Sequence, residues 1–192
     1  HRLDSIKVTK YPMASYDPKK LPFFPSVLRK NGYETACIGK WHLGEDVGHG
    51  RDWDYSVIWD RGGGRRNAMA YYHGTQVRTN GGPREALGGY SNDRFTEIAE
   101  EYILKQAAIS KPWFLWLCYG GVHGPYTPAE RHQNSYSDAP ASRVPVDIFG
   151  PRPTKPEHLK NMTRWKKDGK GEPKGYDAAV KKYHKAVKSL DD

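Results

Sequence analysis

Cysteine is scarce in this sequence, and long hydrophobic runs are missing. Of its 192 residues, two are cysteines, Cys37 and Cys118, and each lies inside a short apolar run. Neither has the spacing of a metal-binding motif, so we expect two buried free thiols, although a disulfide between neighbouring strands stays open. The longest apolar run, Trp113 to Tyr119, is much shorter than a membrane-spanning helix, so no membrane segment is expected.

Two kinds of recognisable segment are also missing. Residues 1–20 show no basic stretch followed by an apolar one, so no targeting signal is expected in this chain. The glycine run Gly62 to Gly64 is not followed by the Lys-Ser or Lys-Thr pair of a phosphate-binding loop. The absence of this pair excludes a phosphate-binding loop of the nucleotide-binding type at these glycines.

Acidic residues are outnumbered by basic ones. The 31 Lys and Arg residues against 22 Asp and Glu give a net charge of +9, and the isoelectric point is near 9.4. This charge favours acidic partners, which include nucleic acids, anionic glycans and sulfate esters. Charge alone does not choose among them.

Two helix–strand units predict the fold class. Residues 21–31 indicate a short helix with Pro25 in its first turn, which Gly32 ends before a strand over 34–39. Residues 91–109 show apolar positions at helical spacing, and Ser91 is a candidate N-cap. The apolar run 113–119 then predicts a central strand with both faces covered. We therefore expect an α/β fold with a mostly parallel sheet flanked by helices, and an incomplete one.

The remaining segments carry weaker patterns. A short strand is expected over 56–59, and the Gly- and Arg-rich segment 65–90 has no clear period, so we expect a long insertion loop. Residues 131–175 are polar and proline-rich, and 176–192 show a helical pattern. The whole chain, 1–192, is interpreted as one interrupted domain whose α/β core covers 21–128.

Polar side chains follow both predicted buried strands. Lys40 and His42 come directly after the first, and His123 follows the second in a loop stiffened by Pro125 and Pro128. Ligands of open α/β sheets bind at the carboxyl ends of the strands, so we expect these three side chains to converge. On spacing alone, a solvent-exposed lysine and ordinary hydrogen-bonded histidines are the commoner explanation.

The identities of these residues resemble a known family. Residues 32–44, GYETACIGKWHLG, are similar to the second signature of the sulfatases, Gly-Tyr-x-Thr-x-x-x-Gly-Lys-Trp-His-Leu-Gly. The loop from His123 to Pro128 is similar to the family's His-x-Pro-x-x-Pro segment. The resemblance implies that Lys40 binds the sulfate group, that His42 hydrogen-bonds a catalytic formylglycine, and that His123 contacts the sulfate ester.

A further polar pair lies near the position of the family's substrate contacts. The resemblance places Asp60 and Arg61 there and implies that they bind substrate, while an exposed surface pair is the alternative. The implied substrate is a sulfated small molecule or a sulfated glycan, and no nucleic acid is expected. A periplasmic, secreted or lysosomal location is implied for the same reason.

Other parts of the family pattern are absent from the sequence. It contains no Cys- or Ser-x-Pro-x-Arg motif, the source of the formylglycine, and neither the paired aspartates nor the later Asp-Asn pair that hold calcium in the family. The resemblance to the alkaline-phosphatase-like sulfatases therefore implies an internal fragment of a catalytic domain, inactive alone. It also implies that Ca²⁺ is held in the complete enzyme by residues outside the fragment.

Three alternatives stay open on the sequence alone. The chain can be a noncatalytic relative that binds an anion or polyanion through Lys40 and His123. It can belong to a related hydrolase of phosphate esters. A basic nucleic-acid-binding module is the third, although the sequence contains no motif of that class.

Overall fold

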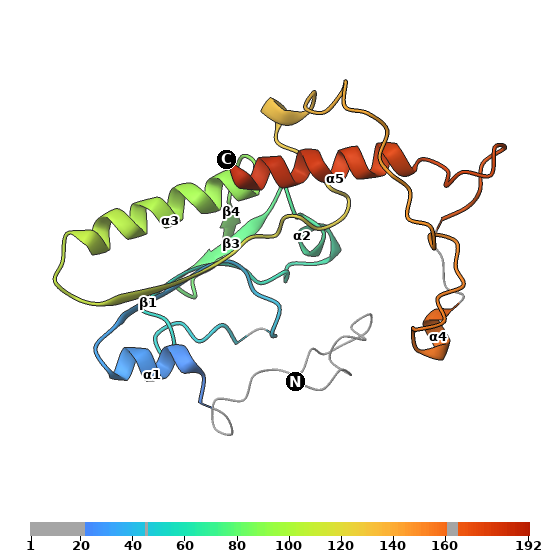
Figure 1. Ribbon diagram of the computed structural model, residues 1–192. Helices are drawn as coiled ribbons and strands as arrows, with labels where there is room; N and C mark the ends of the chain where they lie inside the picture. The colour runs from blue at the N-terminus through green and yellow to red at the C-terminus, as the bar shows by residue number, and fades with distance from the viewer. Residues whose placement is uncertain (1–21, 45, 161–164) are drawn as a thin grey trace. The chain divides into compact units, whose positions relative to one another are not determined.

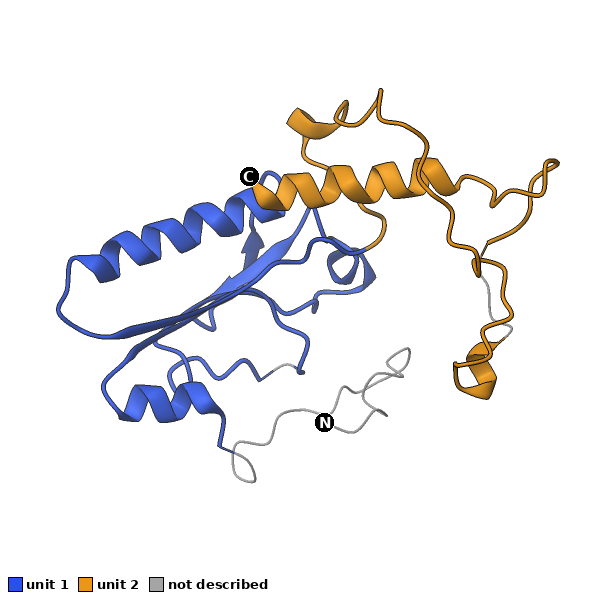
Figure 2. Ribbon diagram, viewed as in Figure 1, with its two compact units in different colours: residues 1–123 blue, residues 124–192 orange. Residues whose placement is uncertain are grey.

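The computed structural model describes residues 22–44, 46–160 and 165–192 (Figure 1). Two compact units make up the chain, residues 1–123 and residues 124–192 (Figure 2). Residues 1–20, which lack a targeting pattern, lie outside the described residues. The interpretation of 1–192 as a single domain stays a prediction.

The first unit contains a five-stranded sheet with the order β4-β3-β2-β1-β5. Its strands are β1 (Glu34–Lys40), β2 (Tyr55–Trp59), β3 (Gln76–Thr79), β4 (Arg84–Ala86) and β5 (Trp113–Cys118). β1 is parallel to both β2 and β5, whereas β3 and β4 continue the sheet as antiparallel strands. The expected α/β fold with a parallel core is therefore confirmed.

Two helices cover this sheet from opposite faces, as Figure 1 shows. Helix α1 (Phe24–Lys30) packs on β1, and helix α3 (Ser91–Ala107) packs on β1 and β5. Proline lies in the first turn of α1, as predicted, and Gly32 follows the helix with a φ of +87°, a conformation that favours glycine. The chain then enters β1 almost at once.

Aromatic side chains form the core beneath α1. Trp53 is completely buried and stacks on Phe114 of β5, with 6.4 Å between ring centroids. Phe23 packs against Trp53 and Trp116 at 5.8 and 5.6 Å. On the α3 face, Tyr102 stacks on Tyr55 of β2 at 5.7 Å. Both faces of β1 and β2 are therefore covered, whereas the residues of β5 stay partly exposed.

Two expectations about the sheet were wrong. β5 lies at the end of the sheet rather than in its centre, and among the described residues no strand pairs with its outer edge. A continuous apolar run predicts that both faces of a strand are covered, but it does not reveal how many neighbours the strand has, and the residues of β5 are only partly buried. The segment 65–90 is not one loop, because it forms helix α2 (Arg65–Ala68) and the hairpin of β3 and β4.

The predicted N-cap at Ser91 was wrong, whereas the predicted free cysteines are confirmed. Ser91 is the first residue of α3 rather than its N-cap, which is Tyr90, and the Ser91 hydroxyl instead donates to the carbonyl oxygen of Tyr71 at 2.6 Å. Both cysteines are free thiols, as predicted, with Cys37 buried and Cys118 half-buried. Burial is the main cause that raises the pKa of each thiol.

β1 and β5 approach each other very closely at Gly39. A Cβ atom at this position would lie 1.9 Å from the carbonyl oxygen of Cys118, and the φ of Gly39 is +111°. Any side chain would therefore push the two strands apart in addition to straining the backbone. Gly39 is needed directly before Lys40, where β1 ends.

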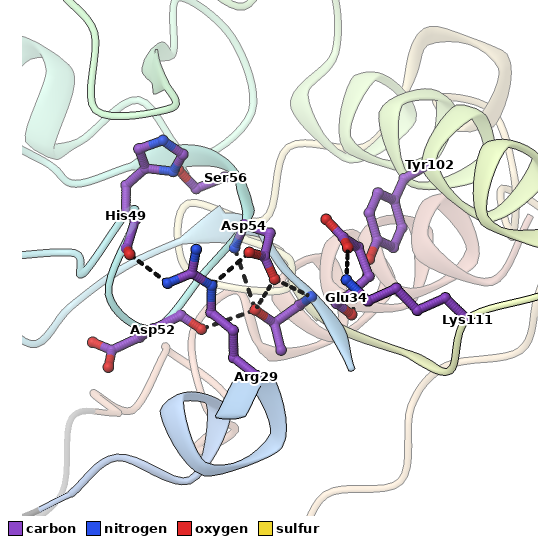
Figure 3. Close-up of polar contacts among 10 residues, drawn as sticks. Arg29, Glu34, His49, Asp52, Asp54, Ser56, Tyr102 and Lys111 are labelled. Atoms are coloured by element: carbon purple, nitrogen blue, oxygen red, sulfur yellow. Dashed lines mark hydrogen bonds and ion pairs between the residues drawn. The ribbon is translucent and has the colours of Figure 1, made fainter. Parts of the chain in front are cut away.

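A polar network fixes the connection between β1 and β2 (Figure 3). The carboxylate of Asp54 accepts hydrogen bonds from Arg29 Nε at 2.5 Å and from the backbone N–H of Thr35 at 3.0 Å. The Thr35 hydroxyl also donates to the carbonyl oxygen of Asp52 at 2.9 Å. Burial raises the pKa of Asp54, but the bonds from Arg29 and Thr35 outweigh it and lower this pKa below its usual value.

The second unit is built around helix α5 (Tyr176–Asp191), and this confirms the predicted C-terminal helix. The Ser189 hydroxyl accepts from the backbone N–H of Ala129 at 2.9 Å, which ties the helix to the 3₁₀ turn Glu130–His132. Helix α4 (Glu157–Lys160) is one turn long, so regular structure is sparse in the proline-rich tract. No helix in the described part of the chain is long and apolar enough to cross a bilayer.

The close approach at Gly39 generates a stability prediction. Gly39→Ala is expected to lower the free energy of unfolding by more than about 3 kcal/mol, because overpacking adds to backbone strain. Gly32→Ala is the matched control, since Gly32 also has a positive φ but a Cβ there meets nothing within 4 Å. It should cost about 1–2 kcal/mol. Urea titrations followed by tryptophan fluorescence measure both, and equal costs would contradict the steric argument.

The Asp54 network generates a second prediction, on pH. Because the pKa of Asp54 is lower in the folded than in the unfolded chain, its stabilisation is present above the unfolded pKa and is lost as pH falls through the folded pKa. Asp54→Asn should therefore lower the free energy of unfolding by about 1–2 kcal/mol at pH 7, and the difference should shrink as pH falls through the lowered pKa of Asp54. Asp138→Asn, at an exposed position, is the control. A difference that persists in acid would refute the charge argument.

Candidate functional site

Three strands of the first unit end at the same edge of the sheet. Because β1, β2 and β5 are parallel, Lys40 at the end of β1 pairs with Trp59 at the end of β2, and Gly39 pairs with Cys118 at the end of β5. His42 leaves β1 directly after Lys40, and His123 lies in the loop that follows β5. The topology thus brings distant parts of the chain to one edge, as the sequence predicts.

An aromatic ring, Tyr71, connects these side chains. The Lys40 ammonium group lies 4.9 Å from the centroid of the Tyr71 ring and 5.9 Å from that of Trp59. The His123 imidazole stacks on Tyr71, with 4.0 Å between centroids and 5° between ring planes. Tyr71 itself is only 3% exposed. A buried tyrosine therefore holds a lysine and a histidine that follow different strands.

The start of α3 holds Tyr71 in place. The Ser91 hydroxyl and backbone N–H donate to the carbonyl oxygens of Tyr71 and Tyr72, at 2.6 and 2.8 Å. The Tyr72 hydroxyl in turn donates to the carbonyl oxygen of His123 at 2.5 Å. These bonds fix the tyrosine pair and the His123 loop to each other.

Arg61 completes a cluster of basic side chains. Its guanidinium Nη1 donates to His42 Nε2, and its Nε donates to the carbonyl oxygen of Ala68 at 3.0 Å. The guanidinium carbon lies 5.7 Å from the centroid of Tyr71. A guanidinium has no acceptor, so His42 Nε2 is the accepting atom, and the neutral ring carries its proton on Nδ1.

The pKa values of His42 and Lys40 are both lowered, by burial and by basic neighbours. Partial burial and then Arg61, Lys40 and His123 lower the pKa of His42 to about 4, so the ring is neutral at pH 7. Burial and Arg61 also lower the pKa of Lys40. Every charged group that shifts these two pKa values is basic, and a bound anion would oppose both shifts.

The sequence-predicted pair Asp60 and Arg61 is divided by the structure. The Asp60 carboxylate is 2% exposed and pairs with Arg84 at 2.7 Å and Arg78 at 3.9 Å, on β4 and β3. It also accepts from the backbone N–H of Gly62 at 2.9 Å. These contacts favour a structural task for Asp60, and its role in binding substrate stays a prediction, while Arg61 joins the basic cluster.

Sequence reasoning missed Tyr71, the residue at the centre of the cluster. Tyr71 lies in the segment expected to be an irregular loop, and no periodicity or motif marks it. Its importance comes from contacts with Lys40, Arg61 and His123, which are distant in sequence. Within residues 22–44, 46–160 and 165–192, no three His, Cys, Asp or Glu side chains gather as a metal site.

Comparisons with known proteins bear on the family and the fold of this chain. The chain matches the family model described as Sulfatase over residues 1–192. It is similar to BT4656, solved with its substrate D-glucosamine-2-N,6-O-disulfate, at 25% identity and a TM-score of 0.58 over 71% of this chain. It is also similar in fold to the putative sulfatase yidJ from Bacteroides fragilis, at 18% identity and a TM-score of 0.57 over 88% of this chain.

A third similar structure is Ps i-CgsB in complex with k-i-k-neocarrahexaose, at 20% identity and a TM-score of 0.52 over 90% of this chain. The matched regions cover only 26% of the BT4656 chain, 37% of the yidJ chain and 36% of the Ps i-CgsB chain. This chain therefore spans between about a quarter and slightly more than a third of the length of each of these proteins. The fold is that of the sulfatases, with their alkaline-phosphatase-like sheet.

The basic cluster generates a prediction on His42. An NMR titration should give a pKa of about 4 for this imidazole, and Arg61→Met should raise it because a basic neighbour is removed. Inorganic sulfate should also raise it, because a nearby anion favours the charged ring. Arg65→Met, at an exposed arginine of α2, is the control and should leave the value unchanged. If neither Arg61→Met nor sulfate changes the pKa of His42, the charges of Arg61 and the anion do not act on this imidazole.

Proposed function

This chain belongs to the sulfatase family, and from that premise we propose that it forms the central part of an enzyme that hydrolyses sulfate esters. The observation that carries the proposal is that Lys40 and His123 meet on the Tyr71 ring, with His42 bound to Arg61 and close enough to Lys40 and His123 to sense their charge. Two of these residues come from the signature at the end of β1, and the third comes from the proline-stiffened loop after β5.

Lys40 and Arg61 supply positive charge to the sulfate group in this proposal. Hydrolysis of a sulfate ester places growing negative charge on the transferred group and on the leaving oxygen. Cationic donors held in fixed positions stabilise that charge, each typically by a few kcal/mol. The Tyr71 ring and the carbonyl oxygen of Ala68 hold the two cations before substrate arrives, so little reorganisation is needed.

The two histidines have different tasks. His42 is neutral at pH 7 because its pKa is about 4, and it offers a hydrogen bond to the nucleophile. His123 contacts the sulfate ester and the leaving oxygen, since stacking on Tyr71 uses the face of its ring and ring nitrogens hydrogen-bond in the ring plane. Both tasks need fixed ring orientations, which Arg61 and Tyr71 provide.

The nucleophile and the metal belong to the complete protein in our proposal. A formylglycine, made from a Cys or Ser, is supplied by sequence outside this chain, and so are the ligands of a calcium ion. The described residues contain no cluster that fits a metal ion. This 192-residue chain is expected to be inactive by itself.

A sulfated glycan is the substrate class that we propose. BT4656, the similar structure at 25% identity, was solved with a disulfated glucosamine named as its substrate. The net charge of +9 fits an anionic substrate of this kind. A periplasmic, secreted or lysosomal location would give access to such glycans and stays a prediction.

A noncatalytic anion-binding relative is the second candidate. The same basic cluster favours it, because Lys40, Arg61 and His123 attract an anion whether or not a nucleophile is present. Turnover by the complete protein separates the two candidates. An aryl phosphate tested beside an aryl sulfate separates sulfate from phosphate ester hydrolysis.

Steady-state kinetics of the complete protein test the proposal. Lys40→Ala should lower kcat for an aryl sulfate by about 10²–10³, because it removes a charge that is needed most in the transition state. Lys30→Ala, at an exposed lysine that ends α1, is the control and should retain the wild-type rate. Normal turnover by Lys40→Ala would refute the assignment of this site, and turnover by the isolated 192-residue chain would refute an external nucleophile.

A further inference from the structure

Asn92 is a buried polar side chain without a hydrogen bond. It lies in the first turn of α3 and is 2% exposed, and neither polar atom of its amide group has a partner among the described residues. Its amide is not a helix cap, since the N-cap is Tyr90 and the structure has no side-chain hydrogen bond at this cap. A buried amide without a partner destabilises the fold. Leucine, which is similar in size, would avoid that cost, so stability does not explain an asparagine here.

The amide of Asn92 lies against the chain that follows β5. A Cβ at Gly121 would lie 2.6 Å from Asn92 Nδ2 and 3.1 Å from its Oδ1, so the amide occupies the space that a side chain at Gly121 would need. Gly120 is packed as closely, because a Cβ there would lie 3.2 Å from the carbonyl oxygen of Tyr71. This pair of glycines leads, after one further residue, to His123.

The backbone of this glycine pair is also unpaired. Within the described ranges, no hydrogen bond holds the main chain of residues 120–122. The chain on either side is fixed, because β5 pairs with β1 up to Cys118 and the Tyr72 hydroxyl donates to the carbonyl oxygen of His123 at 2.5 Å. The segment 120–122 is therefore an unpaired stretch of main chain between two fixed points.

An amide side chain complements such a stretch. A carboxamide offers both donor N–H groups and an acceptor oxygen, and the peptide backbone offers the same two kinds of group. Glycine can turn its backbone toward a partner, since it lacks a Cβ. Asn92 is already in contact with Gly121, so a small rotation of the backbone would bond the two and pair the amide. That rotation would also re-orient His123, two residues further along the chain.

We propose that Asn92 is a positioning residue for His123. When an anion binds the basic cluster, the Asn92 amide bonds to the backbone of the glycine pair, and this bond holds the His123 imidazole against the anion. The amide is unpaired in the described state because the bond forms only with the anion, and such costs are typical of functional sites. This inference rests on the proposed function, which places a sulfate group beside Lys40 and His123.

Stability and kinetics of the complete protein test this role together. Asn92→Leu should raise the midpoint of thermal unfolding by about 2 °C or more, because leucine needs no hydrogen-bond partner. It should also lower kcat/KM for an aryl sulfate about tenfold, because His123 is no longer held in place. A purely structural residue would not change stability and activity in opposite directions. Unchanged kcat/KM in Asn92→Leu would overturn the proposal.

Gln106→Met is the matched control. Gln106 lies at the other end of α3, is 4% exposed and also has an amide oxygen without a partner among the described residues. Gln106→Met should likewise raise the midpoint, while kcat/KM stays within about twofold of wild type. Asn92→Ala, which needs no additional space, replaces Asn92→Leu if the leucine protein does not fold, and it should show the same loss of kcat/KM.

An NMR titration with inorganic sulfate gives a readout that does not depend on turnover. Sulfate should shift the backbone amide resonance of Gly121 in the wild-type and Gln106→Met proteins, and this response should be lost in Asn92→Leu. A Gly121 resonance that ignores sulfate in the wild-type protein overturns the proposal, and so does an equal response in Asn92→Leu. Loss of the response in Asn92→Leu, without turnover by the wild type, would support the positioning role and contradict the enzymatic proposal.

Discussion

Parallel pairing of β1 with both of its neighbours is the constraint on which the site depends. The register sets Lys40 beside the end of β2 and brings the chain after β5 to the same edge. Gly39 permits this register, because only a residue without a Cβ fits against the carbonyl oxygen of Cys118. Gly39 therefore decides where Lys40 leaves the sheet.

Gathering like charges at this edge costs folding energy. Lys40, Arg61 and His123 each disfavour a proton on His42, and the chain tolerates this because a buried tyrosine and backbone carbonyls, rather than carboxylates, hold the cations. Asp60 is adjacent to Arg61 in sequence, yet it is committed to the arginines of β3 and β4. In the proposed function, the positive charge of Lys40 and Arg61 is therefore available to an incoming anion.

The sheet that supports the site carries an unusual edge. β5 is apolar on both faces, packs on α3 and on the aromatic core, and lies at the end of the sheet with no further strand among the described residues. Unpaired apolar edges favour association with other strands. This feature is consistent with our proposal that the chain belongs to a longer protein, in which another segment covers that edge.

The sequence by itself determined the helices and strands with strong periodicity, and through the two motifs it predicted that Lys40, His42 and His123 lie together. These features depend on local order of residues, which a single chain displays directly. Only the tertiary structure decided the place of β5, the short hairpin of β3 and β4, the commitment of Asp60 and the central position of Tyr71. Strands of three or four residues are too short to carry a periodic signal, and a contact such as Tyr71 with His123 exists only when packing brings distant segments together.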